Sequence, residues 1–145
     1  MFSYCTALTK APELPATTLA DYCYDSMFYA CSGLTTAPAL PALELKNKCY
    51  SAMFKECASL TTAPTLPAAS LQANNCYYGM FDGCTKLKSL TCLATSITGS
   101  NCITEWMKEA GSDVTETKTF YRSQSVDDSF WSGNIGTGWT IQPAQ

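Results

Sequence analysis

The residues best equipped for chemistry in this sequence are its nine cysteines, and no histidine accompanies them. A nucleophilic cysteine needs a neighbouring base or cation that lowers the pKa of its thiol. The absence of histidine excludes Ser/His/Asp and Cys/His catalysis, an HExxH metal site and a histidine pH switch within this chain. The sequence therefore predicts a protein that is not an enzyme, has no catalytic residues and uses no cofactor.

Eight of the nine cysteines recur at regular intervals, and Cys92 lies outside this pattern. One column contains Cys5, Cys31, Cys57 and Cys84, and the other contains Cys23, Cys49, Cys76 and Cys102. The chain has no C-x-x-C pair, so the spacing predicts no metal site. Cys92 is a weak candidate nucleophile, because Lys86 and Lys88 are the only basic residues near it.

The two columns can be interpreted in two ways. An even set of cysteines in an exported protein suggests disulfides. However, Cys23 and Cys31 on one helix would lie roughly 12 Å apart, and a disulfide needs Cα atoms within about 7 Å. Residues of one column also project in parallel from successive repeats. The favoured interpretation is a structural ladder of small buried side chains with weak S–H donors.

An internal repeat carries these columns along the chain. The pair Met-Phe recurs about every 26 residues, at Met1, Met27, Met53 and Met80. The shared pattern is C-x-x-L-x-x-A-P-x-L-P-A-x-x-L, then a short polar stretch and C-Y-x-x-M-F-x-x-C. Three units carry it nearly intact, and in the fourth Thr91 and Ala94 replace the prolines. We therefore divide the chain into four repeats, residues 1–102, and a C-terminal capping region, residues 103–145.

Each unit is predicted to contain one short helix and one short strand. Around the second cysteine column, Tyr24, Met27, Phe28 and Cys31 fall on one helical stripe. A residue that can cap a helix precedes this segment in every unit: Asp21, Asn47, Asn74 and Ser100. The threonine-rich residues 60–64 predict a strand of three to five residues that ends at proline.

Neither element could bury its apolar side alone, so the units are expected to stack. The expected fold class is α/β: a leucine-rich-repeat solenoid with short parallel strands on the concave face, short helices on the convex face and a C-terminal cap. Leu8, Leu14 and Leu19, with their equivalents in later units, would line the interior.

The order C-x-x-L, strand, L-P, x-x-L and an aromatic helix closing on F-x-x-C resembles the BspA-like (Treponema pallidum type) leucine-rich repeats. The resemblance covers Met1 to about Cys102, although the unit is longer than the usual one and has Ala37-Pro38 where the family carries Ile. The tail is also similar to the closing segment of such proteins in gut Bacteroidales. The resemblance implies a secreted or cell-surface bacterial protein with an adhesive function.

The C-terminal region loses the repeat and is expected to cover its end. Thr104 is predicted to cap a last helix over residues 105–110, which Gly111 would end in a left-handed conformation. Three aromatic residues are predicted to cover the open core, with surface binding by an exposed tryptophan as the alternative: Phe120, Trp131 and Trp139. The first repeat has no equivalent cap, and its apolar edge could pair two copies in a homodimer.

The charge balance argues against two classes of partner. The net charge is −3 and Arg122 is the only arginine, so no basic patch could follow a phosphate backbone. The longest uncharged run, between Asp25 and Glu44, contains prolines and many threonines and predicts no membrane span. We expect neither nucleic acid nor a membrane span.

A regular, weakly charged repeat surface suits binding better than chemistry. We expect a non-enzymatic binding or adhesion module, at the bacterial cell surface or secreted, whose partner is a host or extracellular protein or a glycan. The outward strand positions are the candidate binding residues: Thr9, Lys10, Thr35, Thr36, Thr61, Thr62, Lys88 and Ser89. A tyrosine column is interpreted as packing rather than as a sugar-stacking row: Tyr24, Tyr50 and Tyr77. The alternative function is a structural spacer or a self-assembling repeat segment of a larger surface protein.

Overall fold

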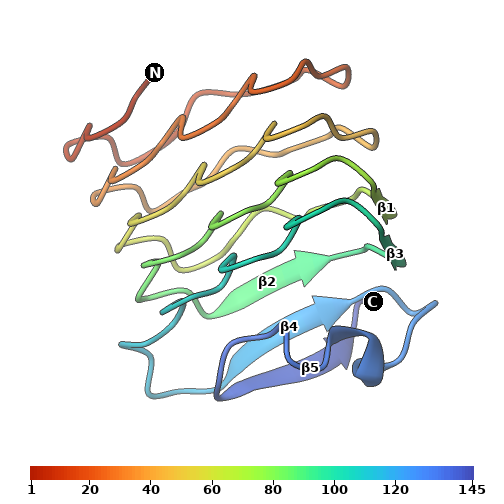
Figure 1. Ribbon diagram of the computed structural model, residues 1–145. Helices are drawn as coiled ribbons and strands as arrows, with labels where there is room; N and C mark the ends of the chain where they lie inside the picture. The colour runs from red at the N-terminus through yellow and green to blue at the C-terminus, as the bar shows by residue number, and fades with distance from the viewer.

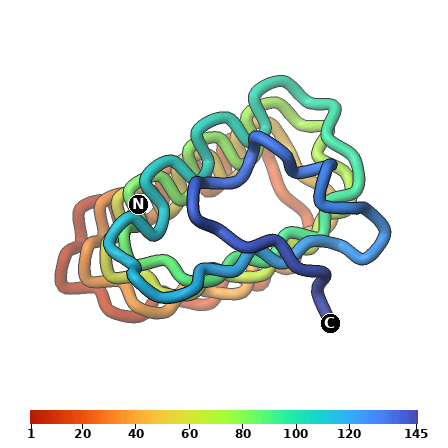
Figure 2. The backbone as a smooth tube through the Cα atoms, turned by 90° about the horizontal axis from the view of Figure 1, so that it is seen from below, coloured from red at the N-terminus to blue at the C-terminus, as the bar shows by residue number.

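The computed structural model describes residues 1–145. Successive units lie one above another (Figure 1), and they overlie one another when the molecule is viewed along the stack (Figure 2). Backbone hydrogen bonds join each unit to the next, as from Phe28 N–H to the carbonyl of Met53 at 3.0 Å. No helix in the chain is long and apolar enough to cross a membrane.

Regular secondary structure is sparse, and the first strand begins only at Ser70. Two short strands, β1 (Ser70–Leu71) and β3 (Ser96–Ile97), pair in parallel. The strands β2 (Ser89–Cys92), β4 (Lys118–Arg122) and β5 (Trp139–Pro143) form a second parallel sheet in the order β2-β4-β5. The chain contains no α-helix.

Consecutive tight turns take the place of the predicted helices. These turn segments cover residues 21–30, 47–56, 74–83 and 100–113. Every fourth residue in them has a positive φ angle, as at Ser26 and Ala30 and, one unit later, at Ala52 and Glu56. A right-handed helix has no such residues, because all of its φ angles lie near −60°.

Alternate amides of a turn segment have different partners. Met27 N–H donates three residues back, to the carbonyl of Tyr24 at 3.2 Å, and so closes a turn. The next amide, of Phe28, donates to Met53 in the following unit at 3.0 Å. An α-helix would use these amides internally. The turn segments therefore link the units in a way that helices could not.

The spacing i, i+3, i+4, i+7 does not distinguish a helix from a turn repeated every four residues. The turn repeat buries two adjacent residues in every four, as at Cys49-Tyr50 and Met53-Phe54, and this produces the same spacings. The predicted helices are therefore wrong. The third unit carries the signal that was overlooked, since Asn75, Gly79 and Gly83 occupy its positive-φ positions and both residue types tolerate that conformation.

Prolines reduce the predicted strands of the first three units to isolated bridges. Thr62 makes a single parallel bridge to Ser89, and Pro64 follows two residues later. Proline has no N–H to continue a ladder. In the fourth unit Thr91 stands at the equivalent position, and β2 there reaches four residues.

These observations overturn the expected α/β leucine-rich-repeat solenoid with strands on a concave face and helices on a convex face. The chain has no α-helix, and its few short strands form two small parallel sheets that do not close into a solenoid. The description as a leucine-rich-repeat solenoid is wrong for two physical reasons. Alternate amides bond to the neighbouring unit, and the repeated prolines interrupt the strand ladder.

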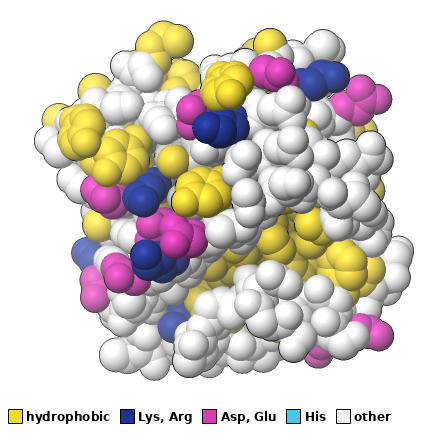
Figure 3. Space-filling model, viewed as in Figure 1, with side chains coloured by type: hydrophobic (Ala, Val, Ile, Leu, Met, Phe, Trp, Pro, Cys, Tyr) yellow, Lys and Arg dark blue, Asp and Glu magenta, His cyan; other side chains and the backbone are white.

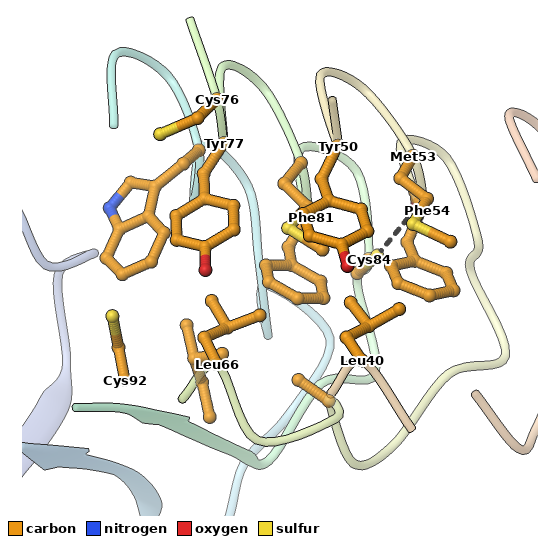
Figure 4. Close-up of a cluster of buried hydrophobic side chains, with 14 of the residues drawn as sticks. Leu40, Tyr50, Met53, Phe54, Leu66, Cys76, Tyr77, Phe81, Cys84 and Cys92 are labelled. Carbon is orange, nitrogen blue, oxygen red and sulfur yellow. Dashed lines mark hydrogen bonds between the residues drawn. The ribbon is translucent and has the colours of Figure 1, made fainter. Parts of the chain in front are cut away.

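The side of the stack that carries the isolated bridges and the strands β2, β4 and β5 is called the sheet side. Columns of similar side chains fill the core between the turn segments and the sheet side (Figure 4). Neighbouring phenylalanine rings stack with centroids 5.6–5.8 Å apart along Phe2, Phe28, Phe54 and Phe81. A second column stacks at 5.8–6.5 Å along Tyr24, Tyr50, Tyr77 and Trp106. Leu14 and Leu19 are buried, and Leu8 is partly buried against the core. Tyr50 and Tyr77 are buried, so they pack in the core and offer no face to a sugar.

The predicted helix caps form a ladder between units instead. Asp21 Oδ1 accepts from Asn47 N–H, Asn47 Oδ1 from Asn74 N–H, and Asn74 Oδ1 from Ser100 N–H, each at 2.9 Å. Each side chain bonds to the same backbone position one unit further along the stack. The capping prediction is wrong, and the short polar residue at this position serves to join neighbouring units.

Aromatic side chains cover the C-terminal end of the stack. Phe120 on β4 and Trp131 on the four-residue 3₁₀ helix η1 (Asp128–Trp131) are fully buried. Trp131 stacks on Trp106 with centroids 5.6 Å apart and meets Phe120 edge-on at 4.9 Å. Trp139 packs partly buried against the same core. The core-covering role predicted for these aromatics agrees with this packing.

The last predicted helix, over residues 105–110 with Thr104 as its cap, is also absent, because the fourth turn segment occupies this stretch. Gly111 does adopt a left-handed conformation, with φ of 69°. A Cβ atom there would lie 2.6 Å from the carbonyl oxygen of Leu87, so the site also needs glycine for space.

Candidate functional site

The predicted binding residues lie at the start of the sheet side of each unit. All are exposed except Ser89, which is half-buried: Thr9, Lys10, Thr35, Thr36, Thr61, Thr62, Lys88 and Ser89. Parallel bridges from Lys10 to Thr36 and from Thr62 to Ser89 hold them in register. Thr35 donates from both N–H and Oγ1 to the carbonyl of Thr9, at 2.9 and 3.1 Å. We call this surface the hydroxyl face.

Two further threonines extend the hydroxyl face, and the sequence did not single them out. Thr119 on β4 pairs with Ser89, and Thr140 on β5 pairs with Thr119. Their register could not be predicted, because the repeat ends before both strands. The alternation of polar Thr119 with apolar Phe120 was the signal available in the sequence, and in the structure Phe120 is fully buried.

Two shallow grooves border the hydroxyl face, with volumes of about 380 and 370 Å³. Pro38 and Pro41 line both grooves, Pro64 and Pro67 line the first, and Pro15 lines the second. Proline rings are rigid and offer no N–H. The surface therefore places hydroxyl groups beside a rigid apolar strip, which we call the proline strip.

The hydroxyl face carries little net charge. Lys88 forms an exposed ion pair with Glu116 at 3.2 Å. Hydrogen bonds from its own backbone amide and from Lys88 lower the pKa of Glu116. Lys10 makes no ion pair, so it is the free cation of this surface.

All nine cysteines are free thiols, and three of the first column donate to backbone carbonyls of the preceding unit. The Sγ atoms of Cys31, Cys57 and Cys84 lie 2.9, 3.2 and 3.0 Å from the carbonyl oxygens of Phe2, Phe28 and Phe54, respectively. In the second column Cys49, Cys76 and Cys102 are buried, while Cys23 is half-buried. Cys5 is the one exposed thiol.

Burial suppresses ionisation of the inner thiols. Desolvation raises the pKa values of Cys49, Cys57 and Cys92 to about 12. At neutral pH these groups are protonated thiols and therefore poor nucleophiles. Nowhere in the chain do three or more His, Cys, Asp or Glu side chains converge as a metal site would require.

The turn segments form a second exposed surface, which the sequence analysis did not identify. Figure 3 shows hydrophobic side chains among small groups of basic and acidic ones on this side of the molecule. Polar contacts cross from unit to unit, from Tyr29 Oη to Glu56 at 3.1 Å and between Lys55 and Asp82 at 2.9 Å. Tyr4 and Tyr22 are its most exposed aromatic residues. These contacts join neighbouring units and balance the charge.

Comparison with known proteins found no family model that matches the chain, and no match among curated proteins or solved structures.

Proposed function

We propose that this chain is a non-enzymatic binding module that recognises an extracellular protein or a glycan through its hydroxyl face. The observation that carries the proposal is the row of outward hydroxyl groups at Thr36, Thr62, Ser89, Thr119 and Thr140, one in each successive unit or strand. A hydroxyl group both donates and accepts hydrogen bonds, so a repeated row suits a neutral, polar partner with its own regular spacing.

The surroundings of this row support binding rather than chemistry. The bordering proline strip supplies rigid apolar contact area, and rigid surfaces lose little entropy when they bind. The buried Cys57 thiol is protonated at neutral pH, and the chain has no histidine that could serve as a base for the exposed hydroxyls. We place the module at a bacterial cell surface or outside the cell, and the resemblance to BspA-like repeats supplies the adhesive element of the proposal.

Arrays of extracellular-matrix proteins and glycans would test this function. We expect at least one reproducible partner, and we expect a double variant, Thr36→Val with Thr62→Val, to bind it about tenfold more weakly. Valine keeps the branched shape of threonine and replaces only the hydroxyl group. A tenfold weaker affinity corresponds to about 1.4 kcal/mol of binding free energy, which is the magnitude expected for the loss of two hydrogen bonds. Thr17→Val, an exposed threonine outside the face, is the matched control. Equal loss in the control would contradict a role for the hydroxyl face.

A structural spacer is the second candidate, and the ladders between units favour it. Stacked rings and unit-to-unit hydrogen bonds run along the whole repeat and give a stiff stack. Absence of any array partner, together with self-association that grows with protein concentration in light scattering, would favour the spacer. A clean monomer with a specific partner would favour the binding module.

A further inference from the structure

The ladder between turn segments is complete three times along the stack. Between the third and fourth segments, five alternate amides donate to five carbonyls at 2.8–3.0 Å. The donors are Asn75, Tyr77, Gly79, Phe81 and Gly83, and the acceptors are Ser100, Cys102, Thr104, Trp106 and Lys108. Each acceptor therefore comes from the main chain, at every second residue of the next segment.

The fourth turn segment presents the same row of amides without partners. These five N–H groups donate to no acceptor in the protein: Asn101, Ile103, Glu105, Met107 and Glu109. The amides between them close turns as in earlier units, as Trp106 N–H does with the carbonyl of Ile103 at 3.3 Å. The row is thus the unpaired end of the ladder between units. Unpaired rows of backbone N–H groups can form hydrogen bonds with the backbone carbonyls of an additional chain segment. We call it the open amide row.

A groove of about 460 Å³ lies directly beside the open amide row. Residues 103–108 of the turn segment line one side and residues 133–136 line the other. Figure 3 shows a hollow with hydrophobic side chains in its floor on this side of the molecule. Trp106 Nε1 donates to the carbonyl of Asn134 at 2.7 Å and ties the two sides together.

The lining of the groove indicates the chemistry of its occupant. Its hydrophobic residues are Ile103, Trp106, Met107 and Ile135. Its two charged side chains, Glu105 and Lys108, have opposite signs and lie 3.9 Å apart. The groove is therefore apolar and carries no net charge, and an extended, uncharged peptide matches both properties. Its backbone carbonyls can face the open amide row while its apolar side chains point to the floor of the groove.

A second copy of the whole chain does not fit this groove as well as a single peptide does. On the sheet side, β4 and β5 continue the stack past β2 by two strand spacings, which is roughly 10 Å. Trp131 already covers Trp106 at the core position that the next unit would fill. A complete unit is therefore held away from the open amide row, whereas one extended segment can reach it.

We propose that the groove between residues 103–108 and 133–136 binds an extended, apolar peptide segment of a partner protein through its main-chain carbonyls. The open amide row supplies the hydrogen bonds, and the hydrophobic floor takes alternate side chains. This site lies on the turn-segment side and is separate from the hydroxyl face.

The test uses the full chain labelled with ¹⁵N and a synthetic peptide with blocked termini that contains residues 99–110. The peptide is made uncharged and free of thiol by four changes: Cys102→Ser, Glu105→Gln, Lys108→Gln and Glu109→Gln. These residues are the probe because they supply the carbonyls that fill the preceding row in the structure. We expect saturable shifts and slowed hydrogen exchange at the amides of Ile103, Glu105 and Met107. Absence of any change there, or changes confined to the hydroxyl face, would overturn the proposal.

Two variants locate the binding. Ile103→Pro removes one donor that has no partner in the protein, and we expect peptide binding at least about fivefold weaker. Ile135→Asp keeps every backbone donor and places a carboxylate opposite the peptide carbonyls, and it should weaken binding to a similar extent. If Ile103→Pro does not fold, Ile135→Asp decides. Peptide binding of wild-type strength in the folded variants would refute the proposal, whereas Thr36→Val with Thr62→Val should change only binding at the hydroxyl face.

Discussion

At the scale of single residues, the cysteines illustrate how position controls chemistry. Cys57 is completely buried, and its thiol donates to the carbonyl of Phe28 at 3.2 Å. Its column had been interpreted from the sequence as a ladder of small buried side chains, with disulfides as the alternative. In the structure all nine cysteines are free thiols spaced along the stack, so they act as small packing groups with weak S–H donors.

Thiol labelling of the native protein should therefore reach very few cysteines. We expect Cys5 to react at once, Cys23 more slowly, and the seven buried thiols only after unfolding. Titration with a coloured disulfide reagent, with and without denaturant but without reductant, measures both numbers. Fewer than six free thiols in the denatured, non-reduced protein would contradict the ladder and support disulfides.

The same burial predicts how stability depends on pH. Desolvation raises the pKa of Cys57 and of Cys92 from 9.0 to about 12 in the folded state. Between those values the unfolded chain binds fewer protons than the folded one, so the free energy of unfolding falls as pH rises. The stabilisation is intact below pH 9, and each such thiol removes about 1.4 kcal/mol per pH unit above it.

Urea unfolding at pH 7, 9 and 10.5 would measure this loss. In Cys57→Ala one titrating group is absent, so the decline between pH 9 and 10.5 should be shallower than in the wild type. A free energy of unfolding that stays constant up to pH 10.5 would contradict the buried, protonated thiols.

At the scale of elements, the sequence defined the repeat but not the conformation inside it. The recurring Met-Phe pairs established the length of the unit and the phenylalanine column, but not that Trp106, at the methionine position of the fourth unit, stacks on Tyr77. They could not separate a helix from a four-residue turn repeat, because both bury Tyr50, Met53, Phe54 and Cys57 together. The difference lies in the backbone, where Ala30, Ala52 and Glu56 hold a positive φ that their residue types do not favour. Hydrogen bonds to the next unit compensate for that local cost.

Ala52→Gly distinguishes the two conformations by the sign of its effect. Ala52 has φ of 49°, which costs an L-residue about 1–2 kcal/mol and costs glycine little. We expect the variant to gain about 0.5–1 kcal/mol after the entropy lost by glycine is subtracted. In a helix the same change would lose about 1 kcal/mol. Thermal unfolding measures the sign, and Ala58→Gly, at a position without positive φ, should be destabilised.

The polar ladder at the start of the turn segments gives a second test at this scale. Asn74→Ala removes the acceptor for the Ser100 amide, and we expect a loss of about 1 kcal/mol in the free energy of unfolding. Asn74→Asp keeps the acceptor and should be close to the wild type. Hydrogen exchange should quicken at Ser100, one unit away. Faster exchange only at Cys76 or Tyr77 would instead indicate a local helix cap.

At the scale of the whole molecule, the predictable part of the candidate site ends where the repeat ends. Thr35, Thr36, Thr61 and Thr62 could be assigned to one surface because their spacing follows the unit. Thr119 and Thr140 could not be assigned to it, because their position depends on the pairing of β4 and β5, and these strands lie outside the repeat. The open amide row was equally hidden, since it arises from the point at which the C-terminal region leaves the stack.

Contacts in this molecule connect neighbouring units, so a defect should spread only a short way along the stack. Trp131→Ala removes a fully buried ring that stacks on Trp106 and meets Phe120, and we expect a loss of about 3–5 kcal/mol. Native-state hydrogen exchange should then quicken strongly in β2, β4 and the fourth turn segment, and only slightly in residues 21–30. Trp139→Ala, at a partly buried position, should have a smaller effect on the same elements. A uniform increase along the whole chain would show instead that the stack unfolds as a single cooperative body, and that the C-terminal aromatics support every unit and not only the last.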